Sequence, residues 1–431
     1  MKLNSTEPIG VLLFLVMCSI QASAQITRQP YLQIITPTSA TISWQSETGV
    51  IGVVYWGTQI SQLDEKTTES EFEEIYHEVK IGGLIPGTKY FYSVEDSVHG
   101  AEDQYFITSP EPGSIGPVRI WVISDFGQST SEQNNRRLET VANWRSFNNN
   151  SYHADFILSL GDQSEDDSRY QLQHNYFVQL EPVLKNSPLF TVIGNHDFHD
   201  SAINYLKTFA LPANAEAGGV PSGNEEYYSF SYANIHVVVL CTEIDNESGI
   251  KAQIEWLKKD LDNNKLDWLV ACMHRPLHSG GYHRSDLEED FQVRRNEWLP
   301  ILESHGVDLI LQGHNHVYER SYLLDNLIGK TTTVTDANII NMGLGREDKE
   351  GAYHKLKNTP HKGTIFIEVP GGGVTTESFE HYSIFPVYYS GDDKEGSVVV
   401  DVNGNRMDVH FICDEMNEKG SHVWDYFTII K

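Results

Sequence analysis

Short runs in which apolar and polar residues alternate fill the first part of the chain, from residue 25 to about residue 110. Examples are Thr41–Trp44, Gly52–Trp56 and Tyr90–Val94. Alternation with a period of two is typical of β-strands that bury one face, and turn signals such as Thr36-Pro37 and Pro86-Gly87 separate the runs. The pattern predicts an all-β domain. Because this segment holds no cluster of metal-binding or nucleophilic side chains, we expect it to serve in packing or spacing.

The pattern changes after a linker-like segment rich in glycine and proline, Glu111–Pro117. Apolar strands now alternate with stretches of helical periodicity, which predicts an α/β domain. The predicted strands are Val118–Ser124, Asp155–Leu160, Pro188–Ile193, Ile235–Cys241, Leu266–Met273 and Val307–Leu311. One predicted helix carries the apolar stripe Ile250, Ile254, Leu257 and Leu261. Strand-like runs return toward the end of the chain, as in Gly363–Pro370.

Composition and charge restrict the classes of protein that fit. The chain has 431 residues, 39% of them hydrophobic and 21% charged, so its composition is that of a globular protein. At about 100–200 residues per domain, it has the length of two or three domains. The formal net charge is −29, and so acidic a surface repels nucleic-acid backbones and anionic lipids. We therefore expect neither as a partner, and the composition does not indicate an oligomeric state.

The first 24 residues have the pattern of a signal peptide. Lys2 gives a weakly positive start, Ile9–Ile20 is an apolar run, and Ala22-Ser23-Ala24 forms a cleavage site before Gln25. The run is too short to span a bilayer comfortably, and nothing downstream resembles a membrane span. A buried strand or helix and a lipid anchor at Cys18 are the alternatives. We expect a protein that is secreted or periplasmic once residues 1–24 are removed.

The remaining cysteines are Cys241, Cys272 and Cys413, each inside an apolar, strand-like run. Their number is odd, and the chain has no metal-type Cys-x-x-Cys spacing. We expect three buried free thiols.

Polar residues follow five of the predicted strands at the point where each strand ends. The five segments are Asp125-Phe126-Gly127, Gly161-Asp162, Gly194-Asn195-His196-Asp197, His274-Arg275-Pro276 and Gly313-His314-Asn315-His316. Ligands of α/β sheets collect at the carboxyl ends of strands. Carboxylates, an amide oxygen and imidazoles are suitable donors for divalent metals. A single Gly-Asp is usually only a turn, but five such segments in this order indicate a metal site.

The order D-x-G, G-D, G-N-H-D, H, G-H-x-H resembles the calcineurin-like metallophosphoesterase superfamily. Several details are similar to the purple acid phosphatases: Gly127-Gln128 after Asp125, the sequence His274–Leu277, and the run GHNHVYERSY at Gly313–Tyr322. The resemblance covers nearly the whole mature chain. It implies a fibronectin type III-like β-sandwich in residues 25–112, where Leu84–Val94 would hold a tyrosine corner. It also implies a metallophosphoesterase αββα sandwich in residues 113–431.

The resemblance also implies roles for single residues. One metal ion would be bound by Asp125, Asp162 and His316, and the second by Asp162, Asn195, His274 and His314. The implied catalytic residues are His196, Asp197, which would orient the His196 ring, and His283, which would assist the leaving group. The implied substrate-binding residues are Asn195 and Arg284. The cofactors would be two divalent or mixed-valence ions of iron, zinc or manganese, about 3.5–4 Å apart.

The implied reaction is hydrolysis of a small phosphate monoester by a metal-bound hydroxide. A phosphodiesterase or nucleotide pyrophosphatase with the same site is the alternative among enzymes. A non-catalytic binding protein is the alternative from another class, but a degenerate site should have lost ligands, and all six principal positions are filled.

Two positions depart from the family pattern. Glu165 stands where the family carries the tyrosine that binds ferric iron and gives the purple colour, and His278 replaces a tyrosine common after H-x-P. Glu165 is either a solvated acid in an acidic loop or a ligand of the first metal. In both cases we expect no tyrosinate-to-iron band, and zinc, manganese or ferrous iron rather than a ferric pair.

Overall fold

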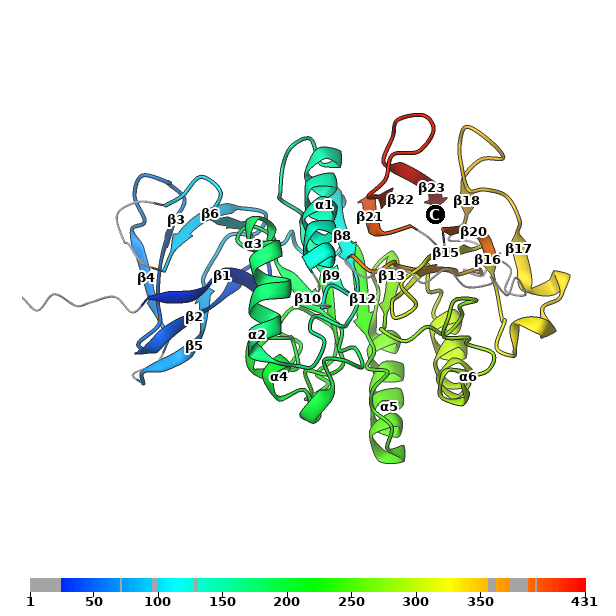
Figure 1. The fold of residues 1–431 in the computed structure, drawn as a ribbon, viewed down its shortest axis with the longest axis horizontal. Coiled ribbons are helices and arrows are strands. Elements are labelled where there is room, and N and C mark those ends of the chain that lie inside the picture. Colours follow the sequence, from blue (N-terminus) through cyan, green and yellow to red (C-terminus); the bar gives the residue numbers. More distant parts are fainter. Residues whose placement is uncertain are drawn as a thin grey trace, which may run out of the picture.

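The computed structural model describes residues 25–69, 72–94, 100–127, 131–355, 362–372, 387–391 and 394–431. The predicted signal peptide, residues 1–24 with Cys18, and Gln128 lie outside the described residues. Figure 1 shows a small all-β part at one end of an elongated molecule and a larger part of sheets and helices beside it. None of the helices in the described ranges combines the length and the apolar character needed to cross a bilayer.

The all-β part consists of two antiparallel sheets. One sheet has the order β1 (Ile26–Ile35), β2 (Ser39–Val50), β5 (Glu74–Gly82). The other has the order β4 (Glu65–Thr68), β3 (Val53–Gly57), β6 (Lys89–Ser93), β7 (Tyr105–Ile107). The hydroxyl of Tyr90 accepts a hydrogen bond from the backbone N–H of Ile85 at 3.0 Å, which is the hydrogen bond of a tyrosine corner. The predicted sandwich is confirmed.

The larger part contains two sheets of seven strands each. The first has the order β10 (Leu189–Thr191), β9 (Phe156–Ser159), β8 (Pro117–Ile123), β21 (Gly396–Asn403), β22 (Arg406–Cys413), β23 (Val423–Ile430), β18 (Tyr353–His354). The second has the order β11 (Tyr228–Tyr232), β12 (Ile235–Val239), β13 (Trp268–Cys272), β14 (Leu309–Gln312), β19 (Ile365–Glu368), β15 (Tyr318–Ser321), β20 (Val387–Gly391). Strands β8, β9 and β10 are parallel in the first sheet, and β12, β13, β14 and β19 in the second. All six strands predicted for the α/β domain are present. A short ribbon, β16 (Leu323–Leu324) with β17 (Ile339–Asn341), lies outside both sheets.

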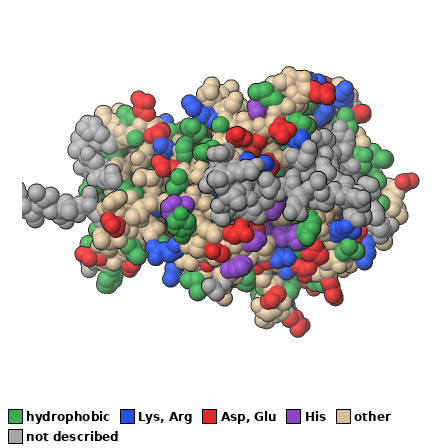
Figure 2. All heavy atoms as spheres, in the orientation of Figure 1, with side chains coloured by type: hydrophobic (Ala, Val, Ile, Leu, Met, Phe, Trp, Pro, Cys, Tyr) green, Lys and Arg blue, Asp and Glu red, His purple; other side chains and the backbone are tan. Residues whose placement is uncertain are grey.

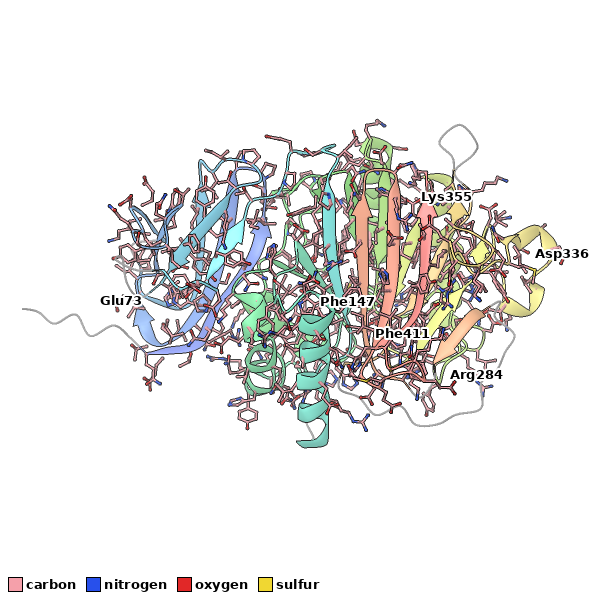
Figure 3. The ribbon with its side chains drawn as sticks, turned by 90° about the horizontal axis from the view of Figure 1, so that it is seen from above. Glu73, Phe147, Arg284, Asp336, Lys355 and Phe411 are labelled. Atoms are coloured by element: carbon pink, nitrogen blue, oxygen red, sulfur yellow. The ribbon has the colours of Figure 1, made fainter. Side chains whose placement is uncertain are left out.

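Helices lie on the outer sides of both sheets, as Figures 1 and 3 show. α1 (Ser131–Phe147) runs beside the first sheet, whereas α5 (Glu247–Asn263) and α6 (Glu289–Ser304) lie on the side of the second. The remaining helical segments are α2 (Arg169–Gln171), the π-helical η1 (Leu172–Phe177), α3 (Val178–Leu184), η2 (His199–Ser201), α4 (Ile203–Thr208), η3 (Thr331–Thr333) and η4 (Asp336–Asn338). The predicted helix with the stripe at Leu257 and Leu261 is α5, and the Asn246 side chain caps its first turn. The αββα arrangement is confirmed.

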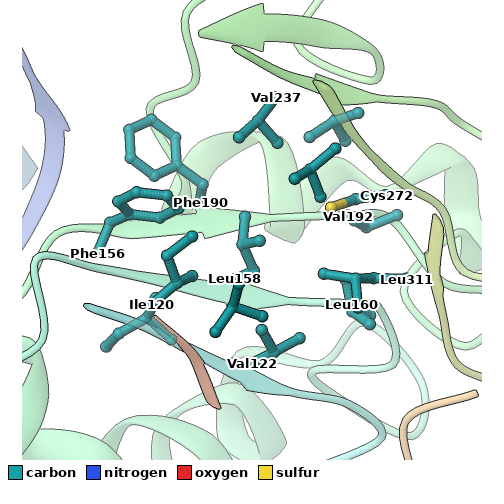
Figure 4. Packing of buried hydrophobic residues seen from close by; sticks show 14 of the residues in the cluster. Ile120, Val122, Phe156, Leu158, Leu160, Phe190, Val192, Val237, Cys272 and Leu311 are labelled. Atoms are coloured by element: carbon teal, nitrogen blue, oxygen red, sulfur yellow. The ribbon is translucent and has the colours of Figure 1, made fainter. Parts of the chain in front are cut away.

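The core between the two sheets is apolar and closely packed. Figure 4 shows Ile120, Val122 and Leu158 of the first sheet opposite side chains of the second, among them Val237 and Leu311. Burying an aliphatic side chain of this size contributes about 1.5–3 kcal/mol, so this core holds the two sheets face to face. The three cysteines predicted to be buried free thiols are confirmed as such. Ser124, just after β8, forms a parallel bridge with Gly371, just after β19, so strand ends of both sheets meet at one edge.

The all-β part is joined to the larger part through buried polar side chains of β1. The guanidinium of Arg28 lies 4.1 Å from the ring centroid of Phe177 in η1. Gln33 accepts from the N–H of Ala210 at 2.8 Å and donates to the carbonyl of Leu189 at 3.1 Å. Because a buried polar group without its partner costs about 1–3 kcal/mol, this junction fixes how the two parts meet. The sequence predicts a role in packing or spacing for this part, and the structure adds these specific polar bonds.

Candidate metal centre

All six residues predicted as metal ligands lie together at the edge where the strand ends meet. One ligand atom of Asp162, of His274 and of His314 can be chosen so that all three lie within 4.8 Å of one another. Nε2 of His316 lies 3.2 Å from Oδ1 of Asp125, and Nε2 of His274 lies 3.1 Å from Oδ1 of Asn195. Figure 2 shows several histidines gathered near the middle of one face, with acidic side chains near them.

Four of these six residues have backbone conformations that are unusual for residues other than glycine. The φ angles are 54° at Asp125, 54° at Asp162, 77° at His314 and 51° at His316. Such conformations cost of order 1–3 kcal/mol each and persist where the surrounding structure determines them. Their concentration in the cluster indicates that the fold is constrained to present these side chains.

Gly161, directly before Asp162, has no possible substitute at its position. Its φ is 107°, and a Cβ atom there would lie 2.3 Å from Nδ1 of His274. Only a residue without a side chain lets the loop after β9 approach the His274 ring so closely. The Gly-Asp pair in the sequence is therefore a packing requirement of the cluster.

The atoms around His274 favour a positive charge at its ring. Its Nδ1 donates to the carbonyl of Leu160 at 2.8 Å, so the proton of a neutral ring is on Nδ1. Nε2 then faces two acceptors, Oδ2 of Asp162 at 3.3 Å and Oδ1 of Asn195 at 3.1 Å. Burial lowers the pKa of His274, but the charge and hydrogen bond of Asp162, with the charges of Asp125 and Glu243, together raise it to about 10. A raised pKa means that a positive charge is favoured at Nε2. A metal ion can supply that charge instead of a proton, bound by Nε2 of His274 and the oxygens of Asp162 and Asn195.

His314 is the clearest sign that the cluster holds a metal. It is buried, and its Nε2 has no hydrogen-bond partner among the described residues. Burial, followed by the charge of His274, lowers the pKa of His314 well below its ordinary value. A buried neutral imidazole with an unpaired nitrogen has a lone pair free for a metal ion. The residues of this site therefore fit the metal ions that the sequence implies.

Asp125 and His316 form the other side of the cluster. Oδ2 of Asp125 accepts from the hydroxyl of Ser124 and from the N–H of His314, and Oδ1 faces His316. Burial raises the pKa of Asp125, but the charge and hydrogen bond of His316, the charge of His274 and the hydrogen bond of Ser124 together lower it to about 2, so the carboxylate is ionised. Glu165 lines the same small hollow as these two residues, together with Asp162 and His196. Glu165 is thus beside the predicted first metal position.

The ring of His196 has a different partner from the one we expected. Its Nδ1 donates to the backbone carbonyl of Glu165 at 2.9 Å. Asp197 instead accepts backbone N–H bonds from Gly194 at 3.0 Å and Ser164 at 3.1 Å. The prediction that Asp197 orients the His196 ring is wrong, because the buried carboxylate is used to join the loops after β9 and β10.

His283 lies against the cluster, with its ring centroid 4.1 Å from that of His314. Its Nδ1 donates to Oε1 of Glu288 at 3.1 Å. Arg284 follows on the same loop, is partly buried, and is labelled in Figure 3 near one edge of the larger part. His278 is buried, bonded to the carbonyl of Leu327 at 2.8 Å and to Arg295 at 3.2 Å, so it has a packing role.

Sequence reasoning missed several residues that hold the ligand loops. Ser124 bonds to Asp125, Glu368 accepts the N–H of Asn315 at 3.1 Å, and Glu319 accepts the hydroxyl of Ser279 at 2.7 Å. Glu368 carried a usable signal, because it ends the apolar run Ile365–Glu368 as the ligands end theirs.

Two family models match the chain. The model described as calcineurin-like phosphoesterase matches residues 118–318, and the model described as purple acid phosphatase, N-terminal domain, matches residues 27–110. Purple acid phosphatase 23 of Arabidopsis thaliana is 28% identical over 394 residues, covering 77% of this chain and 84% of the relative.

Solved structures show the same fold. A purple acid phosphatase from yellow lupin (Lupinus luteus) seeds has a TM-score of 0.71 at 18% identity, covering 93% of this chain and 74% of that one. PhoD has a TM-score of 0.65 at 12% identity, covering 95% and 91%. With both family models matched in this order and a metal-binding cluster at the shared edge of the sheets, the chain belongs to the purple acid phosphatases of the calcineurin-like phosphoesterase superfamily and is a metal-dependent phosphatase with a dinuclear centre.

Proposed function

We propose that this protein is an exported phosphatase that hydrolyses small phosphate monoesters at a centre of two metal ions. The observation that carries the proposal is the buried Nε2 of His314, which lies beside His274 and Asp162 and has no partner within the part of the chain that the structure describes. Asp125, Asp162 and His316 would hold one ion, with Glu165 beside them. The residues that would hold the other are Asp162, Asn195, His274 and His314. The division into residues 25–112 and 113–431 belongs to the same proposal.

The metal pair, when bound, supplies Lewis acidity that stabilises negative charge on the phosphoryl oxygens and makes water acidic near neutral pH. The protein's net charge of −29 repels a phosphate ester, so the attraction has to come from the site itself. Arg275 is the cation next to His274, but Glu243 occupies its Nε at 2.8 Å. We infer that the ligand cluster, not a free arginine at this position, provides the attraction.

His196 and His283 are the side chains proposed to act on the substrate. Since Nδ1 of His196 donates to the Glu165 carbonyl, Nε2 is left for the substrate, 4.0 Å from Oδ2 of Asp162. A protonated Nε2 there can hold a phosphoryl oxygen. His283 has its Nδ1 on Glu288, so its Nε2 is left to donate to the departing alcohol oxygen. Arg284 and Asn195 would hold the remaining phosphoryl oxygens.

Export is the part of the proposal that rests on the sequence alone. The apolar run and the Ala22-Ser23-Ala24 site are the features of a cleaved leader. N-terminal sequencing of protein recovered outside the cytoplasm is expected to begin at Gln25. A mature chain that begins at Met1 would contradict export by cleavage.

Asp162→Asn is expected to lower metal content and activity together. Asp162 belongs to both proposed ligand sets, with its Oδ2 3.3 Å from Nε2 of His274, and an amide removes the negative charge that both ions would share. Metal analysis of the purified variant, beside an assay, measures this. Asp166→Asn in the same loop is the control, because Asp166 is exposed. Two metal ions and a near-normal rate in Asp162→Asn would rule out the shared ligand.

Phosphate monoesters are expected to have a higher kcat/KM than diesters and nucleotide pyrophosphates. His196→Ala is expected to lower the kcat/KM for monoesters about 10²–10⁴-fold. The metal content of His196→Ala should stay unchanged, because its Nδ1 is bonded to backbone. Exposed His174, replaced by alanine, is the matched control. A preference for diesters would favour the alternative function, and loss of metal would mean that His196 is a ligand.

Glu165→Gln is expected to weaken the binding of one metal ion of the two, since Glu165 lines the hollow between Asp125, Asp162 and His316. Calorimetric metal titration of the apoprotein measures this, again with Asp166→Asn as control.

A carboxylate lacks the charge-transfer band of a phenolate, so the unmodified protein should be colourless or pale, and Glu165→Tyr loaded with iron should gain a visible band. A strong purple band before substitution would show that another tyrosine is a ligand.

A further inference from the structure

Asn315 lies between His314 and His316, yet its side chain turns to another loop. Its Oδ1 accepts from the backbone N–H of His283 at 2.7 Å. Its Nδ2 donates to the carbonyl of the same His283 at 2.9 Å and to the hydroxyl of Ser279 at 2.6 Å. One buried amide thus binds both backbone groups of a single residue, 32 positions away in the chain.

The fit between Asn315 and this loop is close. A Cβ atom on Gly281 would lie 2.7 Å from Cγ of Asn315, so glycine is what allows the amide to approach the loop this closely. On its other side, the backbone N–H of Asn315 donates to Oε1 of buried Glu368 at 3.1 Å. Asn315 is therefore fixed on one side by Glu368 and contacts the loop of His283 on the other.

A second residue of the same segment binds the start of the loop. Glu319 accepts from the hydroxyl of Ser279 at 2.7 Å and from the N–H of Gly280 at 3.1 Å. These bonds do not reach His283. Bonds between Ser279 and Ser285 close the loop around His283. The bonds that hold His283 itself are the two from Asn315 to its backbone and the one from its own Nδ1 to Glu288.

The consequence is a fixed distance between His283 and the metal ligands. The His283 ring lies 4.1 Å from the ring of His314, the residue directly before Asn315. A displacement of about 1 Å in a reacting group can cost of order 10²-fold in rate. A residue that ties the backbone of His283 to the ligand segment controls that displacement.

We propose that Asn315 is a positioning residue that holds the backbone of His283 at a set distance from the proposed metal ligands, so that the histidine can donate a hydrogen bond to the departing alcohol oxygen. The inference rests on the proposed function, in which His283 assists the leaving group. An amide is required because the position needs an acceptor for one N–H and donors for a carbonyl and a hydroxyl. Aspartate has no donor for the His283 carbonyl, and alanine has neither group.

The first test needs no metal and no substrate. In apoprotein carrying Asn315→Ala, the amide of His283 should exchange its hydrogen faster than in the unsubstituted apoprotein, because its acceptor is gone. The amide of Gly280 is the internal control, since Glu319 still binds it. Unchanged protection at His283, with Gly280 also unchanged, would overturn the inference.

The second test uses metal-loaded enzyme and a series of monoesters that differ in the acidity of the alcohol. Asn315→Ala and Asn315→Asp should lose about 10²-fold in kcat/KM for alkyl phosphates and little for 4-nitrophenyl phosphate, whose leaving group departs without help. Metal content, measured in parallel, should stay at the unsubstituted level. Exposed Asn263→Asp controls for the added charge. An equal loss with every leaving group would overturn the inference.

A double-mutant cycle separates failure of this inference from failure of the proposed function. In the His283→Ala background, Asn315→Ala should have almost no further effect, because the two residues act as a unit. An undiminished effect would mean that Asn315 acts through the metal ligands. If the loss of kcat/KM in His283→Ala is the same for every leaving group, the proposed role of His283 fails and the inference with it. If the loss in His283→Ala varies with the leaving group but the loss in Asn315→Ala does not, the role of His283 stands and the inference alone fails.

Discussion

Asp162 is the residue through which the loops of both sheets meet. Its Oδ1 accepts the backbone N–H of His196 at 2.9 Å, and its Oδ2 faces His274 at 3.3 Å. Its carbonyl accepts the N–H of Gly127 at 2.8 Å. The residue thus connects the loops after β8, β9 and β10 with a strand end of the second sheet. Its left-handed backbone and the glycine before it are the conditions for reaching all of them at once.

The electrostatics of the cluster follow from this convergence. Buried carboxylates and imidazoles face one another in the cluster. They shift the pKa values of two neighbouring histidines in opposite directions, upward for His274 and downward for His314. Burying such charges is expensive unless each has a partner. Metal ions bound at this cluster would supply those partners, and their binding energy would offset the backbone strain at Asp125, Asp162, His314 and His316. The strain and the missing partners are therefore two aspects of one design for metal binding.

The sequence predicted what local segments determine. Each ligand follows an apolar strand, so Asp125, Asp162 and His274 could be assigned to strand ends without knowing the fold. The apolar stripe of α5 was equally local. Contacts between distant segments could not be predicted in this way: β19 lies between β14 and β15, and the partner of His196 is a carbonyl, which no side-chain pattern reveals.

The residues that hold the ligand loops show why those contacts matter. Glu319 and Glu368 are directly opposite in the antiparallel pair β15–β19, and both are buried. Burial, followed by the charge of Glu319, raises the pKa of Glu368 well above its ordinary value. Keeping these two acids side by side in the core therefore lowers the stability of the fold. Each carboxylate compensates by accepting backbone N–H bonds, Glu319 from the loop of His283 and Glu368 from the segment of His314 and His316. Two acids outside the proposed ligand set thus fix the loop of His283 relative to the segment of His314 and His316.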